Sequence, residues 1–370
     1  MLALGGAFVV GYHASPDSRA TAPVAAPRVV DEVRSALAAR YYRSVPSSVL
    51  QLGSIHEIIS ALGDPYTTYL GPASYRLVRE ETASKYDGIG ASLLPSPEGY
   101  VVVSLRPGPA RSAGIAVGDT IVRIGNTPAA ALSASRAMAR IIGAPGTSVH
   151  LVLRRGRKTF DVRVERAVIH APAVHARLIS FAGRRWGDVH VSVFAIGTSV
   201  LLRHELRLLQ AQGAAGLVLD LREDPGGLLT QAVNVASLFI DRGVVVSLQG
   251  AHHPHQVLRA IPGSATDLPL VILVDRYTAS AAEIVAAALH DHHRATIVGE
   301  RTYGKALVQA VDLLGNGAAL ELSIAHYSTP SGADLAGVGL APQILARDNP
   351  ATPQDEALAA ALHVLARPTS

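Results

Sequence analysis

The sequence of 370 residues contains no cysteine and very little lysine. The lack of cysteine excludes disulfide bonds, thiolate metal ligands and a cysteine nucleophile. Of 33 basic residues, only Lys85, Lys158 and Lys305 are lysine. Arginine stays charged in proteins, whereas a buried lysine can lose its proton. A lysine retained between Gly304 and Ala306 in so arginine-rich a chain is therefore a candidate for a chemical role.

Charged residues are also sparse, at 17% of the chain, while hydrophobic residues make up 49%. This balance excludes a disordered chain and predicts sizeable cores. The formal net charge is only +4, and the chain has no dense basic run interleaved with aromatic residues. These features argue against nucleic-acid binding. The length predicts two or three domains.

Long apolar runs are scarce as well. Residues 1–12 are apolar and uncharged, but they are fewer than the ~20 residues that a membrane-spanning helix needs. A secretory signal usually carries basic residues before its apolar run, and here there are none. We interpret residues 1–28 as a short export signal or membrane anchor with a Pro/Ala-rich linker, and a frayed apolar tail is the alternative. We therefore expect an extracytoplasmic protein, either periplasmic or at the cell surface.

The first two regions after this segment differ in their periodicity. Residues 29–85 have apolar spacings near 3.6, which predict one helix over 29–42 and another over 48–63, ended by Gly63. Residues 86–166 predict a β-rich module. The module contains a short amphipathic helix and a final hairpin that turns at Arg155-Gly156.

Residues 167–370 alternate buried strands with helices, which predicts an α/β layer with parallel strands. Functional loops gather at the carboxyl ends of such strands. Two loops in this position read "REDPGG" (222–227) and "DRYTAS" (275–280).

Several interpretations compete for Lys305. The stretch "GERTYGKA" (299–306) fits a phosphate-binding loop, but Ala306 stands where that motif needs Ser or Thr, and strand-like residues follow instead of a helix. An ordinary solvated turn is a second alternative. A third is a general base, because burial lowers the pKa of a lysine.

A serine nucleophile would need such a base. Ser280 and Glu283 form S-x-x-E, the pattern of a capping box. A helix N-terminus is also where backbone N–H groups and the helix dipole favour a nucleophile.

Histidine clusters at 252–255 and 290–293 raise the alternative of a zinc site. No H-E-x-x-H pattern accompanies them, so solvated loop and helix-end histidines are the simpler interpretation. A hydrolase with a Ser-His-Asp triad is another alternative, but the chain lacks the G-x-S-x-G pattern typical of many such enzymes.

The stretch "TASAAEIVAAALHDHHRATIVGERTYGKALVQ" (278–309) resembles the C-terminal processing peptidases, or tail-specific proteases, of serine peptidase family S41. The similarity extends to "LDLREDPGG", "YSTPSGADLAGVGLAPQI" and "ALGDPYTTYL", and the module at 86–166 resembles the PDZ domain embedded in that family. The motifs occur in order from about residue 30 to 365.

The resemblance implies a Ser–Lys dyad with Ser280 as nucleophile, Lys305 as base and Gln309 orienting the lysine. It implies an oxyanion hole formed by the backbone N–H groups of Gly226 and Ala281. Asp291 is expected to support the site without taking part in the chemistry. The departures from the family pattern are Glu223 and Asp224 in place of two asparagines, Ala306 in place of glycine, Tyr303 in place of phenylalanine and Ala282 in place of serine.

The resemblance also implies a fold and a substrate class. We expect an α/β protease core with ClpP/crotonase-like layers at 167–370, an N-terminal helical region at 29–85 and an inserted PDZ domain at 86–166. The PDZ domain would bind unfolded, apolar C-terminal tails, or only gate the protease. Its expected peptide contacts are Gly88, Ile89, Gly90, Ala91, Met138 and Ile142.

We expect no cofactor, metal or nucleic-acid partner. A homodimer, a regulatory partner and membrane association through the N-terminus all stay open. The alternative function is a non-catalytic peptide-binding relative, which the presence of both Ser280 and Lys305 disfavours.

Overall fold

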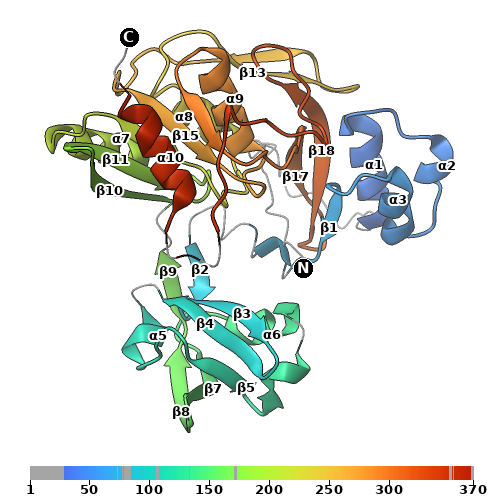
Figure 1. The fold of residues 1–370 in the computed structure, drawn as a ribbon. Helices are drawn as coiled ribbons and strands as arrows, with labels where there is room; N and C mark the ends of the chain where they lie inside the picture. The colour runs from blue at the N-terminus through green and yellow to red at the C-terminus, as the bar shows by residue number, and fades with distance from the viewer. Residues whose placement is uncertain are drawn as a thin grey trace. The chain divides into compact units, whose positions relative to one another are not determined.

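The structure, a computed structural model, describes residues 29–367 apart from 73, 77, 79–84, 106–107, 133, 171–172, 350–351 and 353. The predicted signal or anchor at 1–28 lies outside the described residues. The chain forms two compact units, one from residues up to 82 and from 173 onward, and the other from 83 to 172 (Figure 1). Within the described residues, no helix is both long and apolar enough to cross a membrane.

Three short helices open the first unit: α1 (Val29–Arg40), α2 (Ser47–Leu50) and α3 (Ile55–Leu62). The prediction of one helix over 48–63 was wrong, because a new helix starts at Ser54. The Ser54 hydroxyl accepts the Glu57 N–H at 3.3 Å, and the Glu57 carboxylate accepts the Ser54 N–H at 3.0 Å. This capping box fixes the start of α3. Gly63 ends the helix in the left-handed conformation, as predicted.

The six-stranded sheet of this unit has the order β10-β11-β12-β15-β16-β19. All neighbours from β11 to β19 are parallel and β10 is antiparallel, so the predicted parallel layer is confirmed. The strands are β10 (Val174–Phe181), β11 (Arg184–Val191), β12 (Leu217–Asp220), β15 (Leu270–Val274), β16 (Thr296–Gly299) and β19 (Ile344–Leu345).

A second, antiparallel sheet has the order β1-β18-β13-β14, with β17 also paired to β18. Its strands are β1 (Thr68–Leu70), β13 (Val244–Gln249), β14 (Gln256–Arg259), β17 (Leu307–Leu313) and β18 (Ala319–Ser328). Because Lys305 leads into strand β17 and not into a helix, the phosphate-loop interpretation was wrong.

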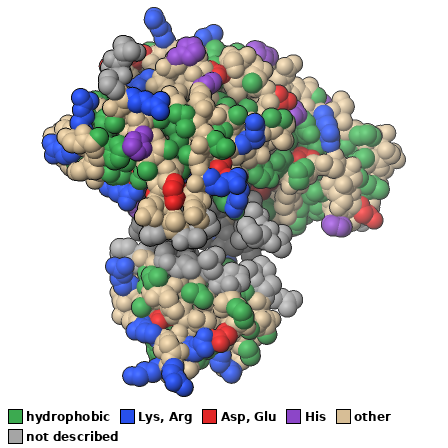
Figure 2. Space-filling model, viewed as in Figure 1, with side chains coloured by type: hydrophobic (Ala, Val, Ile, Leu, Met, Phe, Trp, Pro, Cys, Tyr) green, Lys and Arg blue, Asp and Glu red, His purple; other side chains and the backbone are tan. Residues whose placement is uncertain are grey.

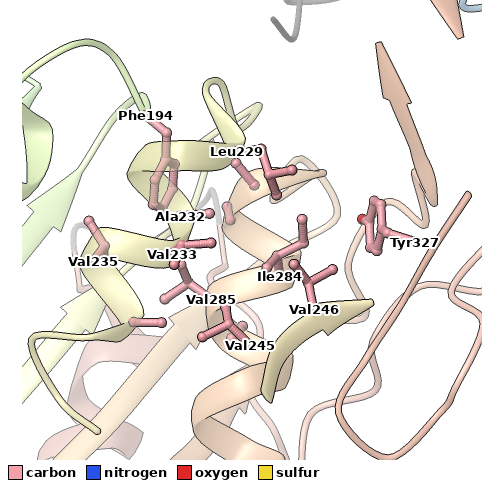
Figure 3. Packing of buried hydrophobic residues seen from close by; sticks show 14 of the residues in the cluster. Phe194, Leu229, Ala232, Val233, Val235, Val245, Val246, Ile284, Val285 and Tyr327 are labelled. Atoms are coloured by element: carbon pink, nitrogen blue, oxygen red, sulfur yellow. The ribbon is translucent and has the colours of Figure 1, made fainter. Parts of the chain in front are cut away.

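Helices cover both faces of the six-stranded sheet: α7 (Thr198–Ala211), α8 (Leu229–Ala236), α9 (Ala281–Asp291) and α10 (Glu356–Leu365). Strand side chains alternate between the two faces. Val189, Leu219 and Ile272 join the core of α7, α8 and α9, whereas Val218 and Leu273 pack with α10. Helix α9 is buried from Ala281 to Leu289, and Figure 3 shows part of its core.

The second unit contains one larger sheet of order β3-β4-β5-β7-β8, with β6 on β5, and a two-stranded β2-β9 sheet. The strands are β2 (Lys85–Gly88), β3 (Ala91–Ser96), β4 (Gly99–Leu105), β5 (Thr120–Ile124), β6 (Thr127–Pro128), β7 (Ser148–Arg155), β8 (Lys158–Glu165) and β9 (Ala167–His170). The helices are α5 (Pro109–Ser112), η1 (Ala129–Ala131) and α6 (Ala134–Ile141). The hairpin turns at Gly156-Arg157, one residue later than predicted.

Candidate active site

Ser280 lies in the turn between β15 and α9, in a conformation that serines rarely adopt. Its backbone angles are φ 53° and ψ −112°, and only 5% of the residue is exposed. A non-glycine residue in so sparsely populated a region costs about 1–3 kcal/mol, and such strain concentrates at functional sites. The surrounding structure therefore holds this one serine at the start of α9 against its own backbone preference.

The N-terminus of α9 supplies backbone donors beside Ser280. Ala281 is the first residue of the helix. The first N–H groups of an α-helix have no acceptor within the helix, and the helix dipole adds partial positive charge there. Ala281 therefore stands where an oxyanion donor for Ser280 is expected, and its role in binding an oxyanion stays a prediction.

Glu283 joins the Ser280 turn to the Lys305 loop. Its buried carboxylate accepts four hydrogen bonds, from the Ser280 N–H at 2.8 Å, the Thr302 hydroxyl at 2.5 Å, the Gly304 N–H at 2.7 Å and the Lys305 N–H at 3.0 Å. Burial raises the pKa of Glu283, and these donors oppose that rise. This role was not predicted from the sequence, because S-x-x-E indicates only a helix cap.

Lys305 is buried, with 4% of the residue exposed. Its ammonium group donates to the Gln309 side-chain oxygen at 2.6 Å. Burial lowers the pKa of Lys305 from 10.5 to about 7, although the carboxylates of Glu321, Asp64 and Glu283 act in the opposite direction. A substantial fraction of this lysine is therefore neutral near pH 7.

Gln309 is itself held in place by the N-terminal part of the chain. Its side-chain amide donates to the backbone carbonyl of Tyr66, and the Tyr66 ring centre lies 4.9 Å from the Lys305 nitrogen. Asp64 fixes this turn by accepting the Tyr66 N–H at 2.9 Å and the Thr67 hydroxyl at 2.7 Å. The available sequence signal for this contact was "DPYTT" (64–68), for which no role in the site was predicted.

The turn that contains Gly226 follows β12, the strand that pairs with β15 in the sheet. It lies beside the turn of Ser280. Gly226 has φ 101°, and a side chain on Gly227 would meet the Phe194 carbonyl oxygen at 2.5 Å, so this turn requires glycine. The Ala279 N–H donates to the Asp224 carbonyl at 2.9 Å, which ties the two turns together. In this structure the Gly226 N–H, the predicted oxyanion donor, donates to the Asp224 side chain at 2.7 Å.

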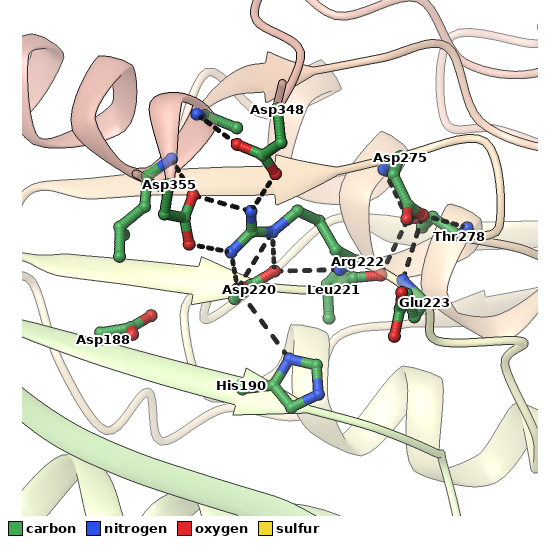
Figure 4. Close-up of polar contacts among 12 residues, drawn as sticks. Asp188, His190, Asp220, Leu221, Arg222, Glu223, Asp275, Thr278, Asp348 and Asp355 are labelled. Carbon is green, nitrogen blue, oxygen red and sulfur yellow. Dashed lines mark hydrogen bonds and ion pairs between the residues drawn. The ribbon is translucent and has the colours of Figure 1, made fainter. Parts of the chain in front are cut away.

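An ion-pair network anchors the start of this turn (Figure 4). The Arg222 guanidinium binds Asp220 at 2.7 Å, and Asp348 and Asp355 at 2.9 Å each. Asp275 accepts the backbone N–H groups of both Glu223 and Thr278. The ion pairs thus fix the start of the 222–227 turn, and Asp275 ties that turn to the 275–280 turn that ends at Ser280.

Ala306 replaces the glycine of the family pattern without backbone strain. It does not belong to the non-glycine residues with positive φ, and its carbonyl accepts the Tyr327 N–H at 3.0 Å. The preceding Gly304, at φ 86°, is the position that needs glycine. A side chain there would lie 2.7 Å from the Gly339 nitrogen.

Asp291 lies at the opposite end of α9 from Ser280, about 16.5 Å away by the helical rise. It accepts the Ser331 N–H at 2.9 Å and contacts the His290 ring at 3.1 Å. Burial tends to raise the pKa of Asp291, but hydrogen bonds from Ser331 and His290 hold it below its usual value. Asp291 thus stabilises the far end of the helix and lies apart from Ser280 and Lys305.

The histidine clusters do not assemble ligands in the described part of the chain, which holds no group of three or more metal-binding side chains. His292 contacts the Val244 carbonyl at 2.8 Å, and His253 contacts the Pro254 carbonyl at 2.9 Å.

On the face shown in Figure 2, basic side chains lie at separate places over both units.

In the second unit, the predicted peptide contacts fall at the junction of β2 and β3 and in and just after the C-terminal half of α6. Gly88 ends β2, Ile89 is buried and Ala91 begins β3, with Gly90 at φ 78° between them. Met138 on α6 is 38% exposed, and its carbonyl accepts the Ile142 N–H at 2.8 Å. Peptide binding at these residues stays a prediction.

Comparisons with known proteins agree with this architecture. The family model "Peptidase family S41" matches residues 185–346, and the model "PDZ domain" matches residues 101–155. The carboxyl-terminal-processing protease of Picosynechococcus is 34% identical over 303 residues, which cover 80% of this chain and 73% of that protein. The carboxy-terminal processing protease CtpA of Bacillus subtilis is 32% identical over 309 residues, covering 83% and 66%.

Among solved structures, the photosystem II D1 C-terminal processing protease aligns with a TM-score of 0.58 and 29% identity. The alignment covers 86% of this chain and 92% of that one. The predicted fold class, a protease α/β core with a PDZ domain, is thereby confirmed.

Proposed function

Because the chain belongs to peptidase family S41, it is a serine-type C-terminal processing protease, and we propose that it cuts with a Ser280–Lys305 dyad. One observation carries the proposal: a buried lysine with a pKa of about 7 and a strained serine share one carboxylate. The Ser280 and Lys305 N–H groups both donate to the same Glu283 oxygen. The two segments are therefore fixed beside each other.

In the proposed reaction, the Ser280 hydroxyl oxygen attacks the carbonyl carbon of the scissile peptide bond. Neutral Lys305 takes the hydroxyl proton and passes it to the leaving amine as the carbon–nitrogen bond breaks. Water then attacks the acyl-enzyme ester, with Lys305 again as base, and Ser280 is released with its proton. Gln309 directs the lysine through its 2.6 Å hydrogen bond. The Ala281 and Gly226 N–H groups stabilise the oxyanion.

The substrates are proteins, and the proposed class is proteins with unfolded, apolar C-terminal tails. A PDZ domain takes an extended tail as an added strand and holds its terminal carboxylate with backbone N–H groups. Gly88 to Ala91 would provide these groups, and the exposed Met138 would contact the last side chain. Whether the domain selects tails or gates the protease is decided by deleting the final apolar residues of a substrate.

The full chain is tested against an unfolded protein ending in an apolar tail. Ser280→Ala and Lys305→Arg should each lower kcat by about a thousandfold or more, as loss of a nucleophile or base does. Lys158→Arg is the matched control, because Lys158 is exposed on β8 of the other unit. Cleavage by Lys305→Arg at the Lys158→Arg rate would show that Lys305 is not the base.

The pH dependence of kcat provides a second test of the base. Only the neutral form of Lys305 can accept a proton, so activity should be lost as the pH falls through about 7. Below that pKa, kcat should decrease about tenfold per pH unit. A profile that is flat from pH 5 to 8 would contradict the assignment.

The location and assembly of the protein are further parts of the proposal. An extracytoplasmic location, with membrane association through residues 1–28, is supported by the apolar composition of residues 1–12. Cell fractionation of the full chain and of a variant lacking residues 1–28 tests it. A homodimer or a regulatory partner protein would be detected by light scattering on the purified protein.

A further inference from the structure

We infer that Asp224 is a positioning residue whose protonation controls whether the Gly226 N–H is available to the oxyanion. The inference rests on the proposed Ser280–Lys305 function. It goes beyond that function because it adds a loss of activity, on ionisation of Asp224, that the dyad does not impose. The residue is also a departure of this chain from the family pattern, which has a neutral asparagine at this position.

The geometry places Asp224 directly on the oxyanion turn. Its Oδ1 atom accepts the Gly226 N–H at 2.7 Å, and its backbone carbonyl accepts the Ala279 N–H at 2.9 Å, one residue before Ser280. Asp224 therefore contacts both turns that meet at the nucleophile. It competes for the same N–H group that the tetrahedral oxyanion requires.

The surroundings of Asp224 do not support a charge. The residue is 0% exposed, and within the described part of the chain its Oδ2 atom has no hydrogen-bond partner. A buried carboxylate with one donor lacks the compensation that ionised groups need in a protein interior. Burial raises the pKa of Asp224 well above its usual value, the Gly226 N–H opposes that rise, and the negative charge of Asp275 adds to it.

The two protonation states differ in how firmly they hold the Gly226 N–H. A carboxylate accepts a charge-assisted hydrogen bond that is roughly twice as strong as a neutral one. The ionised side chain also places negative charge beside the forming oxyanion. The protonated side chain is a weaker, neutral acceptor, as the family's asparagine amide is, and leaves the N–H free to turn to the substrate.

The charged groups that face this turn decide the shape of the pH profile. Asp275 comes from the loop after β15, and Arg222 on the turn itself is already bound by Asp220, Asp348 and Asp355. Lys305 governs the acid side of the profile, since it must be neutral to act as a base. Burial raises the pKa of Asp224, and its ionisation lowers activity as the pH rises through that pKa.

The test measures kcat and KM of the full chain from pH 6 to 10 for wild type, Asp224→Asn and Glu223→Gln. Wild type should show a rise governed by Lys305 and, as Asp224 ionises, a fall of about tenfold per pH unit. Asp224→Asn should keep the rise and lose the fall. Glu223→Gln, which removes the exposed neighbouring carboxylate, should keep both. The differences should lie in kcat, because the oxyanion exists only beyond the ground state.

Superimposable profiles of wild type and Asp224→Asn would overturn the inference while leaving the protease function intact. If Asp224→Asn does not fold, Asp275→Asn is decisive. Removing the Asp275 charge should shift the wild-type alkaline fall to lower pH, and an unmoved fall would overturn the inference. A wild type that neither cuts nor is labelled at Ser280 by a fluorophosphonate would refute the proposed function, and the inference with it.

Discussion

The chain contains two S-x-x-E capping boxes, and they have very different surroundings. Ser54 has ordinary extended angles, φ −131° and ψ 154°, and Glu57 is exposed. Ser280 has φ 53°, and Glu283 is 0% exposed. The first box begins a helix. In the second, the same glutamate also holds the loop of Lys305, 22 residues further along the chain. The buried glutamate thus does more than cap a helix: it joins the Ser280 turn to the Lys305 loop.

The largest difference between the boxes should appear on removing the charge of each glutamate. In Glu283→Gln, an amide nitrogen replaces one oxygen and faces two of the four donors. Two buried donors left unsatisfied should cost about 2–5 kcal/mol of the free energy of unfolding. Glu57→Gln should cost less than about 1 kcal/mol, since water replaces the lost contact. Urea denaturation of both variants measures this, and equal losses would contradict the contrast.

The strained backbone of the second box gives a smaller effect of opposite sign. Ser280→Gly should be more stable than Ser280→Ala by about 1 kcal/mol, because glycine adopts positive φ without a steric penalty. At position 54, which has negative φ, glycine should offer no such relief. Thermal unfolding of the four variants tests the pair. If the melting temperature of Ser280→Gly is no higher than that of Ser280→Ala, the positive φ at residue 280 does not destabilise the protein, and the prediction is wrong.

The smallest predicted effect concerns Glu223, which also has a positive φ, of 59°. Asparagine tolerates this region better than glutamate, and the family pattern has asparagine here. Glu223→Asn should therefore raise the free energy of unfolding by about 0.5 kcal/mol. The exposed side chain makes no buried contact that the change would lose. A lower melting temperature would show that the Glu223 side chain stabilises the turn in another way.

Sequence patterns predicted the parallel layer and the position of Ser280, after a buried strand and at the start of a helix. They failed where distant backbone groups meet a side chain. The split between α2 and α3 depends on a capping box that a 3.6-residue period does not reveal. The bonds from Gly304 and Lys305 to Glu283, and from Gln309 to Tyr66, join segments 21 to 243 residues apart. Local periodicity carries no information about such contacts, because the fold alone brings the partners together.

The hydrogen bond from Gln309 to the Tyr66 carbonyl has a consequence for when the enzyme becomes active. Tyr66 is made early on the ribosome, and Gln309 only after the whole second unit and most of the core have been synthesised. In a nascent chain, Gln309 is held in this way only once β1 has paired with β18 and the turn with Tyr66 is in place. The base of a newly made chain is therefore oriented only late in folding. A fragment beginning after residue 70 lacks the acceptor that completes this arrangement.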